Sequence, residues 1–391
     1  MKKRIALVGL NNFNNMGDQI IAETMQYLVK KNAEANVDVF FVDISPYDSY
    51  CKMYLPFRFK CFNAIRKLEN IANALHSNKI LYFIQYFSWK IKLYRYFKQQ
   101  LKNADAIIFS GGGFIKYRTQ ELNYLVDLVT KIANDKGIPV MMSGMGIEGY
   151  SATDIRCQKL KRAINRSCMK IITTRDNLNL LNERYITNKS IKTALVGDPA
   201  LYIPETYKIK KKSSKIIGLG IIRSDIFIKY GIKFSQKELT ELYKNIIREL
   251  NERNINWKLF SNGLKSDSEF GLKILKDLGI DTDKYVPIPK SSKELVKIVS
   301  EFDAIIGARL HACITAYSLD IPCIGLVWNE KLEYFGKLIA KEKNFINVNQ
   351  LDAKYIVDSL EKIINETYDL EQRYELKKLT KLYIDDFVSM V

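Results

Sequence analysis

The chain has 391 residues, of which 47% are hydrophobic and 27% charged, and its formal net charge is +18. Such a length favours two domains, and the composition excludes a largely disordered chain. No run of about 18 uncharged apolar residues occurs, so no transmembrane helix is predicted. The six cysteines form no C-x-x-C motif and the histidines number two, which argues against a metal site.

The excess of positive charge indicates an anionic partner, whether nucleic acid, a membrane surface or a substrate. No helix-turn-helix, zinc finger or RNA-binding motif is visible, so nucleic acid is not expected. Between Cys51 and Gln100, Lys and Arg alternate with aromatic residues. This pattern suits an anionic bilayer, but it favours a pair of helices whose aromatic side chains face a core, and the two are compatible. Without a signal peptide, we expect a cytoplasmic protein, with peripheral contact to the inner face of the cell membrane as one option.

The first half of the chain alternates apolar runs, typical of buried parallel strands, with helical patterns. Strands are predicted at residues 4–10, 37–43, 104–110, 138–143, 170–174 and 193–196. Each run ends in Gly, Asn, Asp or Arg. Because parallel strands present their carboxyl ends at one edge, we expect these residues to gather where open α/β sheets bind ligands.

Polar residues and glycines at these strand ends are the first candidates for a binding site. They are Asn12, Asn15, Asp18, Gly112, Gly113, Arg175 and Asp198. The alternative is turn chemistry alone, because Asn tolerates left-handed backbone and Asp18 can cap a helix. Neither a G-x-G-x-x-G fingerprint nor a P-loop is present, so a bound dinucleotide is not indicated.

A Lys-rich stretch at residues 204–215 has no apolar pattern and is predicted to link two domains. Strand and helix then alternate again, with strands expected at residues 216–222, 256–260, 285–288, 304–306, 321–328 and 345–348. The pattern after residue 351 is helical to the end of the chain. We therefore expect domains at 1–205 and 206–355, with C-terminal helices at 356–391 that pack back on the first domain.

The stretch from Phe302 to Gly336 holds the clearest candidate site. Gly307 ends a short apolar run, and a helical pattern begins near Ala308, so Arg309 and His311 fall at a helix N-terminus just past a strand. Free N–H groups, the helix dipole and the Arg charge make this a natural anion site. The alternative is an Arg paired with a surface acid and a satisfied core histidine. A Ser/His/Asp hydrolase is excluded, because no G-x-S-x-G motif is present.

Several segments in order resemble the polysaccharide pyruvyl transferase family: GLNNFNNMGDQ, FSGGG, SGMGI, TTRDNLNLL, VGDPALY and FDAIIGARLHACITAYSLDIPCIGL. The resemblance runs from about Leu10 to Phe335. It implies two Rossmann-like α/β domains in a GT-B-like arrangement with the active site in the interdomain cleft. It also implies a transferase that moves the enolpyruvyl group of phosphoenolpyruvate onto two hydroxyls of a sugar. The product is a pyruvate ketal on a bacterial surface or capsular polysaccharide, with phosphate released.

The resemblance also implies roles for individual residues. The family's R-L-H motif matches Arg309, Leu310 and His311, its R-D pair matches Arg175 with Asp176, and Lys331 is similar to a basic residue after the last motif. From charge and strand-end position, His311 is expected to act as the proton donor or as an acid on the phosphate side. It is also expected to bind the donor together with Arg309, Leu310, Arg175 and Lys331. Asp18 and Asp198 are expected to bind or deprotonate the acceptor hydroxyls. The other residues expected to bind the acceptor are Asn12, Asn15, Gly112 and Gly113. Where family members often have Gly before the last strand, this chain has Asp320.

Two other functions fit the same residues. One is a GT-B glycosyltransferase that uses a nucleotide sugar, because an Arg-rich site also suits a diphosphate. The other is a catalytically silent, membrane-associated glycan-binding protein, against which the intact Arg309-Leu310-His311 motif argues. No cofactor is expected beyond phosphoenolpyruvate as co-substrate. One interpretation of the +18 charge is a glycan acceptor linked to polyprenyl diphosphate.

Overall fold

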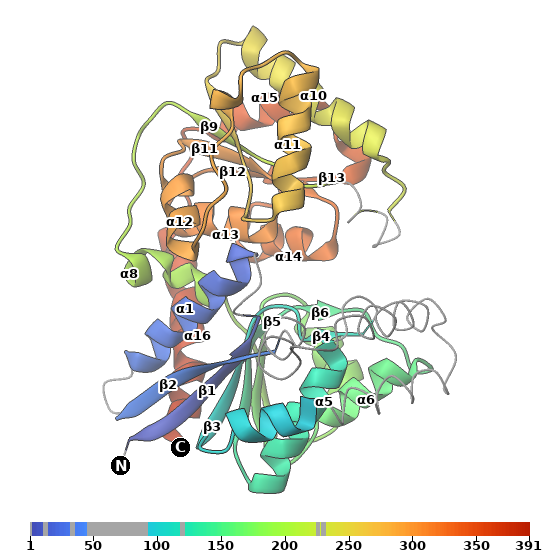
Figure 1. Cartoon of the computed structure of the whole chain (residues 1–391), viewed down its shortest axis with the longest axis vertical. Helices are drawn as coiled ribbons and strands as arrows, with labels where there is room; N and C mark the ends of the chain where they lie inside the picture. The colour runs from blue at the N-terminus through green and yellow to red at the C-terminus, as the bar shows by residue number, and fades with distance from the viewer. Residues whose placement is uncertain are drawn as a thin grey trace, which may run out of the picture. The chain divides into compact units, whose positions relative to one another are not determined.

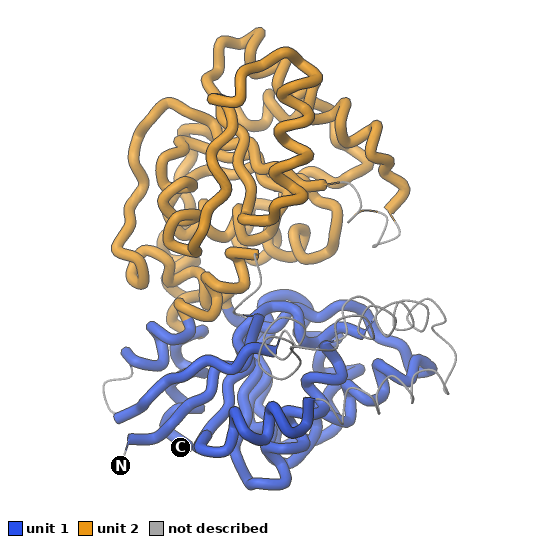
Figure 2. Tube along the Cα trace, viewed as in Figure 1, with its two compact units in different colours: residues 1–13, 25–196, 380–391 blue, residues 14–24, 197–379 orange. Residues whose placement is uncertain are grey.

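The computed structural model describes residues 2–10, 15–31, 36–44, 93–117, 122–223, 227 and 232–391. The chain forms two compact units, which Figure 2 colours separately. Unit 1 comprises residues 1–13, 25–196 and 380–391, and unit 2 comprises residues 14–24 and 197–379. Each unit has a parallel sheet with helices, as expected from the alternating pattern of the sequence. Of the basic and aromatic segment at 51–100, residues 51–92 lie outside the described residues.

Unit 1 contains a six-stranded parallel sheet (Figure 1). Its strand order is β2-β1-β3-β5-β7-β8, and Ser110 of β3 is in register with Ser143 of β5. The side chains from Ile5 to Val8 have no exposed surface, which is why this run is apolar at successive positions rather than alternate ones. The strands are β1 (Lys3–Gly9), β2 (Val37–Asp43), β3 (Ala106–Ser110), β5 (Val140–Met145), β7 (Met169–Thr174) and β8 (Lys192–Leu195).

Short elements at the carboxyl ends of these strands complete unit 1. A two-stranded parallel ladder joins β4 (Ile115–Lys116) to β6 (Ile147–Glu148). The helices are α5 (Leu122–Lys136), α6 (Ile155–Ile164), α7 (Leu178–Leu180) and a π-helical turn at Leu181–Tyr185. Asp154 caps α6 by accepting a hydrogen bond from the Arg156 N–H at 2.8 Å.

Unit 2 contains a five-stranded parallel sheet in the order β10-β9-β11-β12-β13. The strands are β9 (Ile217–Gly220), β10 (Trp257–Phe260), β11 (Ala304–Gly307), β12 (Cys323–Val327) and β13 (Phe345–Asn347). Its helices are α8 (Ile203–Tyr207), α10 (Gln236–Glu252), α11 (Lys265–Asp277), α12 (Ser292–Ser300), α13 (Leu310–Ser318), α14 (Glu330–Leu338) and α15 (Ala353–Ile363). Short 3₁₀ turns occur at Pro199–Tyr202, Thr282–Lys284, Glu342–Asn344 and Val348–Gln350.

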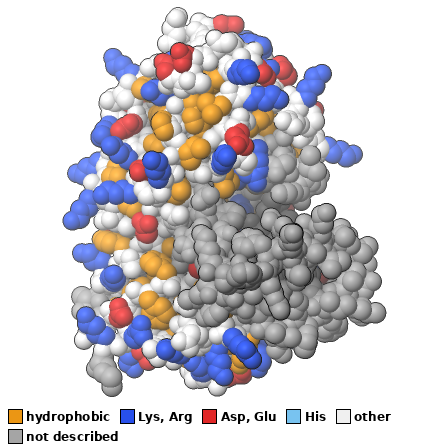
Figure 3. Space-filling model, in the orientation of Figure 1, with side chains coloured by type: hydrophobic (Ala, Val, Ile, Leu, Met, Phe, Trp, Pro, Cys, Tyr) orange, Lys and Arg blue, Asp and Glu red, His pale blue; other side chains and the backbone are white. Residues whose placement is uncertain are grey.

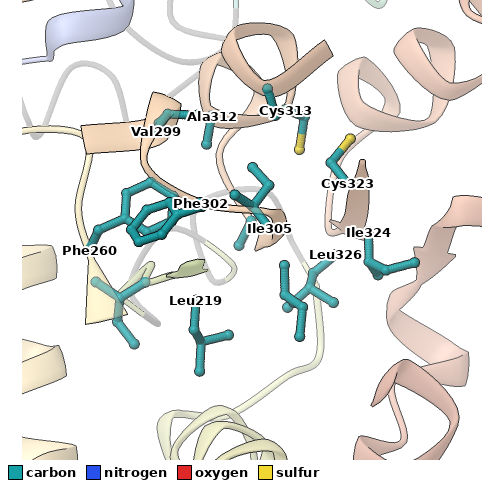
Figure 4. Packing of buried hydrophobic residues seen from close by; sticks show 14 of the residues in the cluster. Leu219, Phe260, Val299, Phe302, Ile305, Ala312, Cys313, Cys323, Ile324 and Leu326 are labelled. Atoms are coloured by element: carbon teal, nitrogen blue, oxygen red, sulfur yellow. The ribbon is translucent and has the colours of Figure 1, made fainter. Parts of the chain in front are cut away.

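The core of unit 2 packs side chains from the sheet against α13 and its neighbours (Figure 4). The rings of Phe260 and Phe302 lie with their centroids 5.3 Å apart. Cys313 and Cys323 are buried and their sulfur atoms point toward one another, as Figure 4 shows. Both cysteines are therefore small core residues, as the apolar surroundings in the sequence predict.

Three details differ from the expectation. The run 285–288 is not a strand, because only an isolated bridge pairs Tyr285 with Leu259. Helix α13 begins at Leu310 rather than near Ala308, since Arg309 has extended backbone and is the N-cap residue. The C-terminal region is broken into α15 and α16 (Leu370–Ser389).

Two segments pass from one unit to the other. Helix α1 (Met16–Lys30) begins in unit 2 and belongs to unit 1 from Met25 onward, and α16 belongs to unit 1 from Thr380. The main change of unit falls between Val196 and Gly197, whereas the sequence suggests a border at 205/206. The Lys-rich stretch at 204–215 therefore lies wholly in unit 2, where Lys212 N–H donates to the Ser300 carbonyl at 2.7 Å.

Lys and Arg side chains are spread over the described surface in Figure 3, with Asp and Glu side chains among them. Many surface cations are paired, for example Lys337 with Glu333 at 2.6 Å and Lys341 with Glu366 at 2.7 Å. In the part of the chain that the structure describes, no helix is both long enough and apolar enough to span a bilayer.

Candidate functional site

The carboxyl ends of three adjacent strands in unit 2 each precede a basic residue. Arg223 follows β9, Arg309 follows β11, and Lys331 lies in the first turn of α14 after β12. Strands β9, β11 and β12 are neighbours in the sheet, so one edge carries all three cations. This edge is where open α/β sheets bind ligands.

His311 lies in the first turn of α13 and faces a buried acid. Its Nε2 is 3.9 Å from Oδ2 of Asp198, and the two side chains are 12% and 1% exposed. The other carboxylate oxygen of Asp198 accepts a hydrogen bond from the Ala200 N–H at 2.8 Å, which caps the 3₁₀ turn at 199–202. The cap holds the carboxylate in place opposite the imidazole.

The other side of the imidazole lies against the start of α1. A Cβ atom on Gly17 would come within 2.8 Å of the His311 Cβ and closer still to the ring, so only glycine fits at this position. The Met16 N–H donates to the Asn262 carbonyl at 3.1 Å, which ties this helix end to the turn after β10. Asp18 follows Gly17 directly and accepts a hydrogen bond from the Asn15 amide at 2.9 Å. The structure therefore brings Gly17 and Asp198 to His311, and it pairs Asn15 with Asp18 at the start of the same helix as Gly17.

Arg309 is held by an acid that the motif analysis missed. Its Nε and Nη2 donate to the Asp267 carboxylate at 3.0, 2.8 and 2.6 Å, and the Asp267 side chain has no exposed surface. The Arg223 N–H also donates to this carboxylate, at 3.2 Å. The available sequence signal was an acid in the first turn of the helix after residues 256–260, but such an acid usually only complements the helix dipole.

Leu310 and Lys331 complete the residues expected in unit 2. Leu310 is half-buried and packs against the hydrophobic core, so its side chain anchors the start of α13. Lys331 is half-buried near the N-terminus of α14, which Asn329 caps by accepting from the Leu332 N–H at 3.3 Å.

Arg175 and Gly112 meet in unit 1. Arg175 follows β7 and is 6% exposed, and its guanidinium lies over Gly112 in the turn after β3. A Cβ on Gly112 would come within 2.7 Å of Nη1 and closer still to Nη2. Gly113 lies beside the Lys116 ammonium, with 3.5 Å between the position of an added Cβ and Nζ. The triple-glycine turn thus leaves room for two cationic side chains.

Asp176 has a structural task beside this cluster. Its carboxylate accepts from the Ile147 N–H at 3.0 Å, the Thr174 hydroxyl at 2.8 Å and the Asn177 N–H at 2.5 Å. Burial raises the pKa of this carboxyl above its usual value, against the effect of those hydrogen bonds. Asp176 therefore fixes the turn that carries Arg175.

The expected residues thus fall into two groups within the described chain. Asp18, Asp198, Arg309, Leu310, His311, Lys331 and Asn15 lie in unit 2, whereas Arg175, Gly112 and Gly113 lie in unit 1. Asn12 lies outside the described residues. No group of three or more His, Cys, Asp or Glu side chains in the described ranges is arranged to hold a metal ion.

The family model for polysaccharide pyruvyl transferase matches residues 15–330, which include every unit 2 residue above except Lys331. The chain belongs to the polysaccharide pyruvyl transferase family. It is accordingly a transferase, and a glycan acceptor is consistent with that membership. A comparison with curated proteins returned no match.

Solved structures with the same fold include UDP-GlcNAc 2-epimerases. The enzyme of Methanocaldococcus jannaschii is 12% identical, with a TM-score of 0.56 over 98% of this chain and 99% of that chain. The enzyme of Neisseria meningitidis bound to UDP-GlcNAc is 14% identical, with a TM-score of 0.54 over the whole of both chains. A putative enzyme from Listeria monocytogenes is 11% identical, with a TM-score of 0.55 over 97% and 95%. At such identities the likeness shows the fold alone, a two-domain α/β fold of the GT-B type.

Proposed function

We propose that this transferase moves the enolpyruvyl group of phosphoenolpyruvate onto two hydroxyls of a sugar, and so forms a pyruvate ketal during synthesis of a bacterial surface or capsular polysaccharide. The observation that carries the proposal is the placement of His311. The imidazole lies at a helix N-terminus, against Gly17 and opposite the buried Asp198, next to an arginine on the same turn. Family membership supports the reaction class.

The chemistry needs an acid, an anion site and a base. Protonation of C3 of the donor gives a methyl group and an electrophilic C2. One sugar hydroxyl adds to C2, phosphate leaves with the electrons of the C–O bond, and the second hydroxyl adds to close the ketal. The two hydroxyls lose two protons in all, one of which balances the proton gained at C3 while the other leaves on phosphate.

His311 can supply the proton to C3, because histidine is the side chain most often used as a general acid and this imidazole lies opposite the buried Asp198. Asp18 can accept protons from the hydroxyls. Arg309, Lys331 and Arg175 are the cations proposed for the donor's phosphate and carboxylate, because guanidinium groups bind such anions through paired hydrogen bonds. Leu310 contributes through the position it gives the helix start.

We further propose that the acceptor glycan is carried on a polyprenyl diphosphate and that the protein works at the inner face of the cell membrane. The formal charge of +18 supports electrostatic attraction to such a surface. Attraction of this kind weakens with salt. Activity on a lipid-linked acceptor should therefore fall between about 50 and 500 mM salt while activity on a soluble glycoside does not. Equal salt responses would remove the membrane part of the proposal.

The deciding experiment measures phosphate release from phosphoenolpyruvate in the presence of a panel of glycosides with neighbouring hydroxyl pairs. A parallel assay follows nucleotide release from a panel of nucleotide sugars. Release of phosphate with a ketal-bearing product detected by mass spectrometry supports the proposal. Release of nucleotide alone would instead establish a glycosyltransferase, and binding of glycan without turnover of any donor would establish a binding protein.

A further inference from the structure

The buried carboxylate of Asp267 connects three parts of the unit 2 strand ends. It lies in the first turn of α11, it accepts hydrogen bonds from Nε and Nη2 of Arg309, and it accepts one from the backbone N–H of Arg223. The Arg223 Nη1 is also 3.6 Å from Oδ1. One acid thus links the segment after β9, the helix after β10 and the N-cap of α13.

Both partners of the carboxylate are held by further contacts. The Tyr243 hydroxyl donates to the Gly220 carbonyl at 3.0 Å and accepts from the Ile222 N–H at 3.2 Å, which fixes the backbone that leads to Arg223. On the other side, the Trp328 indole N–H donates to the Ala308 carbonyl at 2.6 Å, next to Arg309. These contacts fix the backbone on both sides of Asp267, and the Asp267 carboxylate in turn orients the Arg309 guanidinium.

The cluster of Arg223, Arg309 and Asp267 has a net charge of one positive unit. Arg223 and Arg309 carry two, and Asp267 removes one. The Arg309 side chain is 14% exposed and the Arg223 side chain is 27% exposed, so both guanidinium groups can still be reached from outside while the acid cannot. One buried acid between two arginines holds both guanidinium groups in place. It also reduces the repulsion that two unpaired cations would feel.

We infer that Asp267 is a positioning residue for the transfer reaction: it orients Arg309, and through its backbone contact Arg223, toward the anionic donor. This inference rests on the proposed function. Asp267 touches no donor itself, because its carboxylate is wholly buried. Loss of the Asp267 carboxylate should leave Arg309 charged, with its guanidinium in the wrong orientation for the donor.

The first variant is Asp267→Asn, which keeps the size of the side chain and removes its charge. We expect kcat with phosphoenolpyruvate to fall about 10- to 100-fold, since a reacting group misplaced by about 1 Å can cost that much. KM should change by less than about threefold, because the cation count near the donor does not decrease. The matched control is Asp127→Asn in unit 1, where the buried Asp127 likewise forms an ion pair with an arginine, Arg166. The control should lower the melting temperature and leave kcat unchanged.

A double-mutant cycle tests whether Asp267 acts through Arg309. If it does, Asp267→Asn should lower kcat only slightly in a protein that already carries Arg309→Lys, because the guanidinium that Asp267 orients is then absent. Asp127→Asn should show no such coupling to Arg309→Lys. Additive losses for Asp267→Asn and Arg309→Lys would overturn the inference.

A charge-balanced variant covers the case in which Asp267→Asn does not fold. Arg223→Gln together with Asp267→Asn removes one positive and one negative charge, so that the cluster keeps its net charge. Measured against Arg223→Gln alone, the double variant should still lose about tenfold in kcat. Equal kcat values for the two would show that Asp267 does not orient Arg309, and the inference would fail.

The outcomes also separate this inference from the proposed function. If the wild-type protein neither binds phosphoenolpyruvate in calorimetry nor releases phosphate from it, the proposed function fails and this inference fails with it. If the wild-type protein is active and Asp267→Asn loses no more kcat than Asp127→Asn, only the role of Asp267 is overturned.

Discussion

The strand ends of the two units hold their cations in different ways. In unit 1, Arg175 lies over Gly112. The neighbouring Asp176 accepts hydrogen bonds from backbone N–H groups and a hydroxyl. In unit 2, His311 lies over Gly17 but also faces Asp198, and Arg309 is gripped by Asp267. Both units use a glycine to make space, and in unit 2 the buried acids Asp198 and Asp267 also face the functional side chains.

This difference has a physical consequence. A guanidinium that donates through two nitrogens to a buried carboxylate, as Arg309 does to Asp267, keeps a single orientation. We therefore expect the chemical step to depend on unit 2 and donor binding to be shared with Arg175. The predictions below test this division, from the largest expected effect to the smallest.

Replacement of His311 should have the largest effect. His311→Ala removes the proposed acid, and loss of a general acid typically costs about 10²- to 10⁴-fold. We expect a fall of that size in kcat with phosphoenolpyruvate, while calorimetric binding of the donor persists. A His311→Ala protein that transfers at the wild-type rate would end the assignment of the chemical step to unit 2.

Gly112→Ala should come next. The new Cβ would lie 2.7 Å from Nη1 of Arg175 and closer still to Nη2, so the guanidinium must move. Because it is the far end of a flexible side chain, stability should change little while kcat/KM for phosphoenolpyruvate falls about tenfold or more. The loss should be absent when Arg175→Ala is already present. Independent losses in the double variant would mean that Gly112 acts without Arg175.

Gly17→Ala tests the corresponding contact in unit 2. Alanine normally stabilises a helix relative to glycine, by up to about 1 kcal/mol in a helix interior. Here the methyl group would displace the His311 ring. We expect kcat to fall about tenfold with KM for the donor nearly unchanged, in contrast to the effect on kcat/KM at Gly112. Similar kinetic patterns at both glycines would remove the distinction between the units.

Gly218→Ala is the structural counterpart and should affect activity least. A Cβ on this residue of β9 would lie 2.9 Å from Cγ of Phe302, inside the hydrophobic core. Overpacking of this kind costs about 1–3 kcal/mol of unfolding free energy, measured by chemical denaturation. Activity per folded molecule should stay at the wild-type level. A loss of kcat like that of Gly17→Ala would show that glycine contacts affect catalysis only through general packing.

The sequence by itself determined the local features of this protein. Apolar runs in the sequence predict the buried parallel strands, because such strands are covered on both faces. The R-L-H motif was likewise visible, as was its place at a helix start after a strand.

Only the tertiary structure decided which distant residues meet. The approach of Gly17 to His311 and of Asp267 to Arg309 joins segments 294 and 42 residues apart, and no local pattern encodes such pairs. The same reason explains the error at 285–288, where an apolar stretch finds a single bridge instead of a ladder. Strands and helices are determined largely by residues that are neighbours along the chain. The partner of a buried charge is determined by tertiary packing, because only the fold brings the acid and the cation together.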